Sequence, residues 1–93
     1  MKKRVFKSVW DALEDSAEQA ANMRLRSELM IALRGQVEAW NTTQARAAKR
    51  LRITQPRLND LLCGRIDKFG LDALVGLAER ARLEVRLEVR AAA

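Results

Sequence analysis

The sequence contains no histidine, no tyrosine, one proline and a single cysteine, Cys63. One cysteine without histidine cannot supply the ligand shell of a zinc ion, so we expect no metal site. A lone thiol cannot close an internal disulfide, which fits a chain kept in a reducing compartment. Because the thiol has no histidine base and no glycine-rich phosphate loop is present, we expect neither enzymatic activity nor a cofactor.

Long apolar runs are also missing. The longest, residues 29–33 (LMIAL), is far shorter than the roughly 20 residues of a membrane-spanning helix. The basic start at residues 2–4 is not followed by the apolar segment of a secretory signal. We therefore predict a cytoplasmic, nucleoid-associated protein with no membrane contact. A chain of 93 residues forms one domain with a modest core, which self-association would stabilise further.

Positive charge is what the chain has in excess. The chain has eighteen lysines and arginines and twelve acidic residues, which gives a net charge of +6. This excess of positive charge favours a polyanionic partner. Residues 43–65 (TQARAAKRLRITQPRLNDLLCGR) carry six basic residues against Asp60 alone, a net +5. The charge thus concentrates in one quarter of the sequence.

This stretch predicts two short helices joined by a tight turn. Thr43 can cap a helix that starts at Gln44, and Thr54 can cap a second helix with Pro56 in its first turn. The first helix would turn its apolar residues inward, and Ile53 would plug the turn between the helices. The expected inward residues are Ala45, Ala48, Leu51, Leu58, Leu61 and Leu62.

That leucine ridge leaves an outward face on the second helix. Gln55 and Asn59 fall on it, and amide side chains can pair bidentately with adenine. The alternative is an ordinary helical hairpin with a solvated basic face. On the first interpretation we predict base contacts from Gln55, Pro56, Asn59 and Asp60. The predicted phosphate contacts are Thr43, Gln44, Thr54, Arg57, Arg65 and Lys68.

The N-terminal part divides into an arm and a long helix. Residues 1–15 form a basic arm whose Phe6 and Trp10 either pack on the domain or anchor a partner protein. Ser16 and Gln19 have capping-box spacing and predict a helix from residue 16 to about residue 40. Its expected inward stripe is Leu25, Leu29, Ala32, Leu33, Gln36, Val37 and Trp40. Its expected solvated face holds Arg24, Arg26 and Arg34.

After Gly64, a predicted left-handed stop, Ile66 and Phe69 should tuck into the core. A last helix should begin near residue 70 and bury Leu71, Leu74, Val75, Ala78 and Ala81. Residues 83–89 then alternate apolar and charged residues, which predicts a strand, with a continued helix as the alternative. A lone strand needs a partner, so we expect residues 82–90 to pair with a second copy. The dimerisation residues would be Leu83, Val85, Leu87 and Val89.

Several motifs together resemble the Xre-like (phage-repressor-like) helix-turn-helix regulators, in their antitoxin-type (HigA-like) branch. They are residues 29–33 (LMIAL), Thr43–Gln44, residues 47–48, residues 53–57, residues 60–62 with Gly64, residues 69–72 with Leu74, and the alternating tail. The resemblance implies a mainly α, λ-repressor-like bundle of four to five helices spanning residues 16–81, with its helix-turn-helix at 43–65. That family usually has glycine in the turn. Here Arg52 stands instead, at a cost of roughly 1 kcal/mol if the backbone is left-handed.

The resemblance also implies a homodimer that binds a double-stranded operator upstream of its own operon and often neutralises a RelE-like toxin. From the sequence we therefore predict a sequence-specific transcriptional autorepressor and antitoxin. One alternative is a protein-binding inhibitor that acts mainly through the N-terminal arm. Another is a solitary phage-like regulator without a toxin. RNA binding is disfavoured because the chain lacks exposed aromatics for base stacking.

Overall fold

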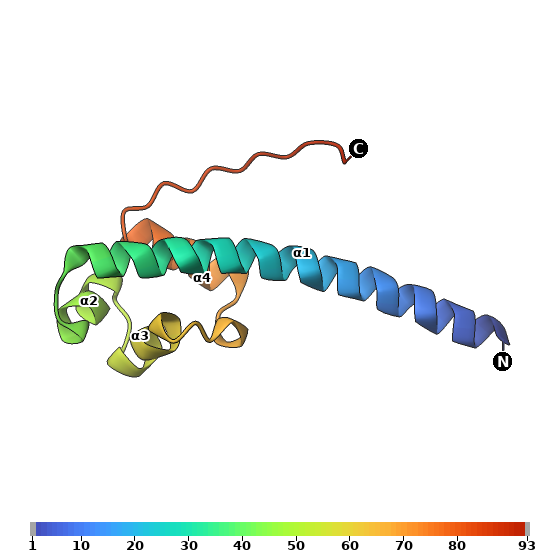
Figure 1. Ribbon diagram of the computed structural model, residues 1–93, viewed down its shortest axis with the longest axis horizontal. Helices are drawn as coiled ribbons and strands as arrows, with labels where there is room; N and C mark the ends of the chain where they lie inside the picture. The colour runs from blue at the N-terminus through green and yellow to red at the C-terminus, as the bar shows by residue number, and fades with distance from the viewer. Residues whose placement is uncertain (1, 93) are drawn as a thin grey trace.

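The computed structural model describes the backbone of residues 2–92 and the side chains of residues 16–92. The elements are α1 (Lys2–Trp40), α2 (Gln44–Leu51), α3 (Gln55–Leu62), the single 3-10 turn η1 (Ile66–Lys68) and α4 (Leu71–Arg80). The C-terminal half of α1 lies across α2, α3 and α4, and its N-terminal half extends beyond them (Figure 1). The expected mainly helical architecture with a helix-turn-helix is confirmed.

Helix α1 is longer than the sequence suggested. Ser16 was expected to cap its start, but helical backbone runs through Ser16 from Lys2 onward. A capping box can start a helix only where the helix is interrupted before it. No interruption occurs here, because neither proline nor glycine occurs before Gly35 and most residues in this part of the chain are good helix formers. Phe6 and Trp10 lie outside the residues whose side chains the structure describes.

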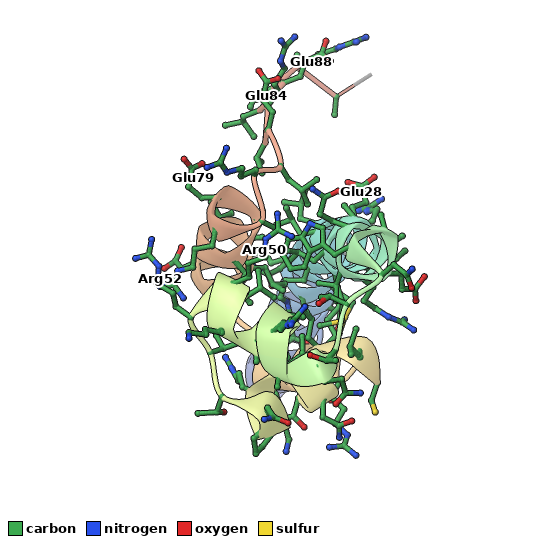
Figure 2. The ribbon with its side chains drawn as sticks, turned by 90° about the vertical axis from the view of Figure 1, so that its left-hand side faces the viewer. Glu28, Arg50, Arg52, Glu79, Glu84 and Glu88 are labelled. Carbon is green, nitrogen blue, oxygen red and sulfur yellow. The ribbon has the colours of Figure 1, made fainter. Side chains whose placement is uncertain are left out.

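One apolar core joins all four helices. The second half of α1 meets the helix-turn-helix on one side and α4 on the other, and Phe69 fills the space after η1. Figure 2, which looks from the α2 side, shows the side chains converging between the ribbons. The core residues are Met30, Leu33, Val37, Ala47, Ala48, Leu51, Leu58, Leu61, Phe69, Leu74, Leu77, Ala78 and Ala81.

Three of the expected inward stripes are confirmed in part. The predicted members that lie in the core are Leu33, Val37, Ala48, Leu51, Leu74, Ala78 and Ala81. In α1, Leu25 is 47% exposed while Met30 is buried, and Ala32 is exposed as well. In α2 the buried residue is Ala47 and not Ala45. In α4, Val75 is exposed and Leu77 and Leu74 are buried, with Leu71 only partly covered. The direction of the neighbouring helices decides which apolar residues of each helix are covered.

The turns follow the sequence closely. Arg52 ends α2 in the left-handed region with φ 56° and ψ 43°, as expected for the position that favours glycine. Gly64 stops α3 with φ 71°, which confirms its role. Phe69 is fully buried and Ile66 is half-buried, so both tuck inward as predicted.

The C-terminal tail, residues 83–92, is neither helix nor strand. The alternative of a continued helix is therefore wrong: the backbone turns at Arg82, where φ is 61°, and leaves the bundle (Figure 1). Leu83 packs against the core, whereas Leu87 and Val89 are 84% and 81% exposed. Because a strand requires a backbone partner and the described part of this single chain offers none, pairing across a dimer stays a prediction. Among the described residues, no helix is long and apolar enough to cross a membrane.

Candidate nucleic-acid interface

In helix α3 the leucine side chains point into the core and the amide side chains point to solvent. Leu58 and Leu61 have no exposed surface, while Gln55, Pro56 and Asn59 are exposed. Leu62 is half-covered at the edge of the core. The outward face deduced from the leucine ridge is therefore exposed to solvent.

Both helices of the motif begin with a threonine cap. The Thr43 Oγ1 accepts a hydrogen bond from the Arg46 N–H at 3.2 Å, and the Thr54 Oγ1 accepts one from the Arg57 N–H, also at 3.2 Å. Pro56 lies in the first turn of α3, where its missing N–H leaves no gap. The other N–H groups of each first turn stay free to meet an anion at the positive end of the helix.

Asp60 is engaged by its own chain. Its Oδ1 lies 2.6 Å from Arg65 Nη1 and 3.7 Å from Lys68 Nζ. The hydrogen bond from Arg65 lowers the pKa of the Asp60 carboxyl below its ordinary value of 3.8 and raises the pKa of Arg65. The carboxylate thus draws two predicted phosphate contacts together beside the C-terminal end of α3.

Arg57 ties α3 to the loop that follows it. Its Nη1 donates to the Lys68 carbonyl oxygen at 2.7 Å, and its guanidinium lies 3.9 Å from the centre of the Phe69 ring. Such a cation–π contact fixes the side chain in one position. Arg57 can therefore contact a phosphate in its present position beside Phe69. To reach a phosphate elsewhere, it would have to break its contacts with Lys68 and Phe69.

Among the side chains of residues 16–92, the Asn59 amide forms one hydrogen bond. The Cys63 Sγ lies 3.7 Å from Asn59 Oδ1 and donates a weak hydrogen bond to it across one helical turn. This contact engages the carbonyl oxygen of the amide, and the NH2 group makes no hydrogen bond in the part of the chain whose side chains the structure describes. The NH2 group is a donor, so it is suited to acceptors on base edges.

Two arginines of α1 were assigned wrongly to its solvated face. Arg26 Nη1 donates to the carbonyls of Ile66 at 3.1 Å and Phe69 at 3.5 Å and so holds η1 against α1. Arg34 is half-buried beside Gly64, where a Cβ would meet Arg34 Nη1 at 3.5 Å. The sequence carried no signal for either contact, because both join residues about 30 or more positions apart.

Part of the positive charge counted in the motif lies on another side of the molecule. Arg50 stacks on the Trp40 ring at 4.1 Å, and Arg80 donates to the Leu51 carbonyl at 3.0 Å. A hollow of about 450 Å³ opens at the ends of α2 and α4; Figure 2 labels three of its residues. Its lining is Arg50, Arg52, Glu79, Arg80 and Arg82. The charge of residues 43–65 is thus divided between the α3 face and this flank.

Comparison with known proteins agrees with this geometry. The model of a family described as "Helix-turn-helix domain" matches residues 12–90, most of the chain. No curated protein matches the chain significantly. The matched segment contains the capped helix pair, the exposed amide face, α4 and most of the tail.

Proposed function

Because the chain belongs to the family of helix-turn-helix domains, we propose that it is a dimeric, sequence-specific transcriptional regulator that represses its own operon. The observation that carries the proposal is the α3 surface. Gln55, Pro56 and Asn59 stand exposed above a fully buried Leu58–Leu61 ridge, directly after a threonine-capped turn. Side chains held on a rigid helix in this way suit the major groove, which admits an α-helix.

We assign the roles as follows. Gln55, Pro56 and Asn59 meet base edges, and Asp60 either accepts from cytosine or only orients Arg65, since both of its ion pairs use Oδ1. Phosphates are held by the first turns of α2 and α3 and by the cationic cluster after α3. The phosphate set is Thr43, Gln44, Thr54, Arg57, Arg65 and Lys68.

Two copies would join through the extended tail, with Leu83, Val85, Leu87 and Val89 in the interface. A two-fold dimer presents two α3 helices to half-sites about one helical turn, or roughly 34 Å, apart. The antitoxin role, with a RelE-like toxin as partner, is supported only by the resemblance to the antitoxin branch and by the free N-terminal half of α1 (Figure 1).

The test compares a base contact with a phosphate contact. An operator is first selected from random duplexes by the wild-type chain. On the selected duplex, Asn59→Ala should cost about 1–3 kcal/mol of binding free energy, with little change on a scrambled duplex. Arg65→Ala should weaken binding to both duplexes alike. It should also reduce the slope of log K against log salt concentration by about one.

Arg24→Ala is the matched control, because it removes the same charge from an exposed position on α1. It should leave both affinities and the salt slope near wild type. Equal losses on the selected and scrambled duplexes for Asn59→Ala would remove the assigned base contact. Failure of the wild-type chain to enrich any duplex would remove the proposed function.

A second function, protein binding through residues 1–15, is favoured by the position of that segment at the free end of α1 (Figure 1). A chain lacking these residues keeps α2, α3 and α4 and the part of α1 that packs on them. We expect the truncated chain to bind the selected duplex normally. We expect it no longer to bind the protein encoded by the neighbouring reading frame. Loss of duplex binding in this truncation would place the segment in the DNA-binding unit instead.

A further inference from the structure

The tail of each chain carries a face with no partner. Residues 83–92 are extended, and along them Val85 is 48%, Leu87 84% and Val89 81% exposed. We propose that two tails pair antiparallel in one particular register, with Leu87 lying on the two-fold axis opposite Leu87 of the second copy. This register rests on the proposed homodimer and goes beyond it, because it fixes which residues meet.

The alternation of apolar and charged residues in the tail excludes half of the possible antiparallel registers. Residues directly opposite each other in an antiparallel pair project to the same face. Apolar residues occupy the odd positions 83–89 and charged residues the even positions 84–90. Any register that sets an odd residue against an even one would put charged side chains on the apolar face, so odd must meet odd.

Charge then separates the registers that remain. With Leu87 on the axis, Glu84 meets Arg90 and Arg86 meets Glu88, so all four charged residues of each tail face an opposite charge. With Arg86 on the axis, Arg86 faces itself and Glu84 faces Glu88. With Glu88 on the axis, Glu88 faces itself and Arg86 faces Arg90. Like charges directly opposite each other disfavour both of these registers.

Length decides between the registers with favourable charges. With Leu87 on the axis, residues 83–91 of both chains are paired. With Val85 on the axis, the ladder must stop near Arg82, whose φ of 61° turns the backbone away, and Val89 would lie opposite Ala81, the C-cap of α4. With Val89 on the axis, the described residues that pair are only 86–92 of each chain. The Leu87 register therefore pairs the most backbone.

The single chain already shows the two faces that this ribbon needs. Arg86 Nε lies 3.0 Å from Glu84 Oε1, and Arg90 Nη2 lies 2.6 Å from Glu88 Oε1. These pairs span two residues, so the charged side chains share one side of an extended backbone. Figure 2 shows Glu84 and Glu88 beyond the end of α4, on the part of the tail that leaves the bundle.

The tail runs along an open hollow of the bundle. About 360 Å³ lies between α1, α4 and the tail, and the tail residues that line it are Leu83, Glu84, Val85, Arg86 and Leu87. On the side of the bundle the lining is mainly apolar and includes Leu25, Leu29 and Val75. Leu25 and Val75 are 47% and 42% exposed in the single chain. In the Leu87 register the second copy's tail lies beside this hollow along the paired segment, so its odd-numbered side chains can cover it.

Disulfide cross-linking in single-cysteine chains reads the register directly. The background is Cys63→Ser, with Val85→Cys, Leu87→Cys or Val89→Cys added. Directly opposite Cα atoms lie about 4.5–5.5 Å apart, within the range a disulfide accepts. In the Leu87 register, two copies of residue 85 lie four residues apart along the ribbon, about 13 Å. We expect Leu87→Cys dimers to oxidise at least roughly tenfold faster than Val85→Cys or Val89→Cys dimers.

Mixing gives the positive control for the other two variants. When tagged Val85→Cys and untagged Val89→Cys chains are unfolded and refolded together, the disulfide should join one chain of each kind. Fast self-linking of Val85→Cys, or equal rates for all three variants, would overturn the register; equal rates indicate parallel strands. Sedimentation equilibrium of the Cys63→Ser parent separates the two proposals. A monomer refutes the dimer itself, whereas a dimer without cross-links refutes only the role of the tail.

Discussion

Replacing Arg52 with glycine should make the protein more stable, although it removes a large side chain. Arg52 ends α2 with φ 56° and ψ 43°, and its backbone N–H donates to the carbonyls of Ala48 and Lys49. An L-residue in this left-handed conformation brings its Cβ close to the following carbonyl, a clash that glycine avoids. The helix-turn-helix is thus built over a turn that carries steric strain.

The magnitude follows from two opposing effects. Relief of the left-handed strain contributes about 1–2 kcal/mol. The greater freedom of glycine in the unfolded chain costs about 0.4–1 kcal/mol. No hydrogen bond or ion pair formed by the Arg52 side chain occurs within residues 16–92, so little else is lost. We expect a net gain of roughly 0.5–1 kcal/mol, which for a chain of this size corresponds to about 2–8 °C in Tm.

Urea unfolding followed by circular dichroism, at one fixed protein concentration, measures this change. The matched control is Lys49→Gly, an exposed position inside α2 where φ needs no glycine. It should lose about 1 kcal/mol. Opposite signs for the two variants support the strained turn. If Arg52→Gly is destabilised as much as Lys49→Gly, the left-handed strain does not exist or the Arg52 side chain stabilises the fold by another route.

Three further predictions concern the supports of α3. Leu61→Ala, at a fully buried position, should lower the free energy of unfolding by about 2–5 kcal/mol in urea titrations, and Leu62→Ala at the core edge by clearly less. Gly64→Ala should cost about 1–2 kcal/mol, because φ is 71° there. Arg65 lowers the pKa of the Asp60 carboxyl below 3.8. The stability from this pair is complete above that pH and is lost as the pH falls through the lower folded pKa, so thermal unfolding of Asp60→Asn should depend less on pH below about 4.

The helix-turn-helix could be read from the sequence because its signals are local. Thr43 and Thr54 bond to backbone groups only three residues away, and Gly64 stops a helix within one turn of Leu61. The leucine ridge of α3 has a single apolar arc, so only one orientation buries it. Each of these features is decided by neighbours in the chain, which is where sequence reasoning is strong.

Most of the predictions that were wrong concern contacts between distant parts of the chain. Met30 is buried and Leu25 is exposed because α3, η1 and α4 pack on α1 at positions that no local pattern records. Arg26 looked like a solvated residue, yet it donates to carbonyls 40 and 43 residues later. The capping box at Ser16 failed for another reason: it is a local signal that was overridden by an uninterrupted run of helix-forming residues.

The contacts of the arginines change what the net charge means for DNA binding. Arg26, Arg57 and Arg80 each donate to a backbone carbonyl of another segment. A guanidinium held in this way keeps its charge and its other N–H donors, but it can meet only a phosphate that comes to its fixed position. The salt slope of DNA binding counts only the phosphates that are neutralised, at about 0.9 per contact. The slope per monomer should therefore be set by the cations of the phosphate set, Arg57, Arg65 and Lys68, and should fall well below the chain's net charge of +6. A slope near 6 per monomer would mean that cations outside this set also meet phosphates when DNA binds.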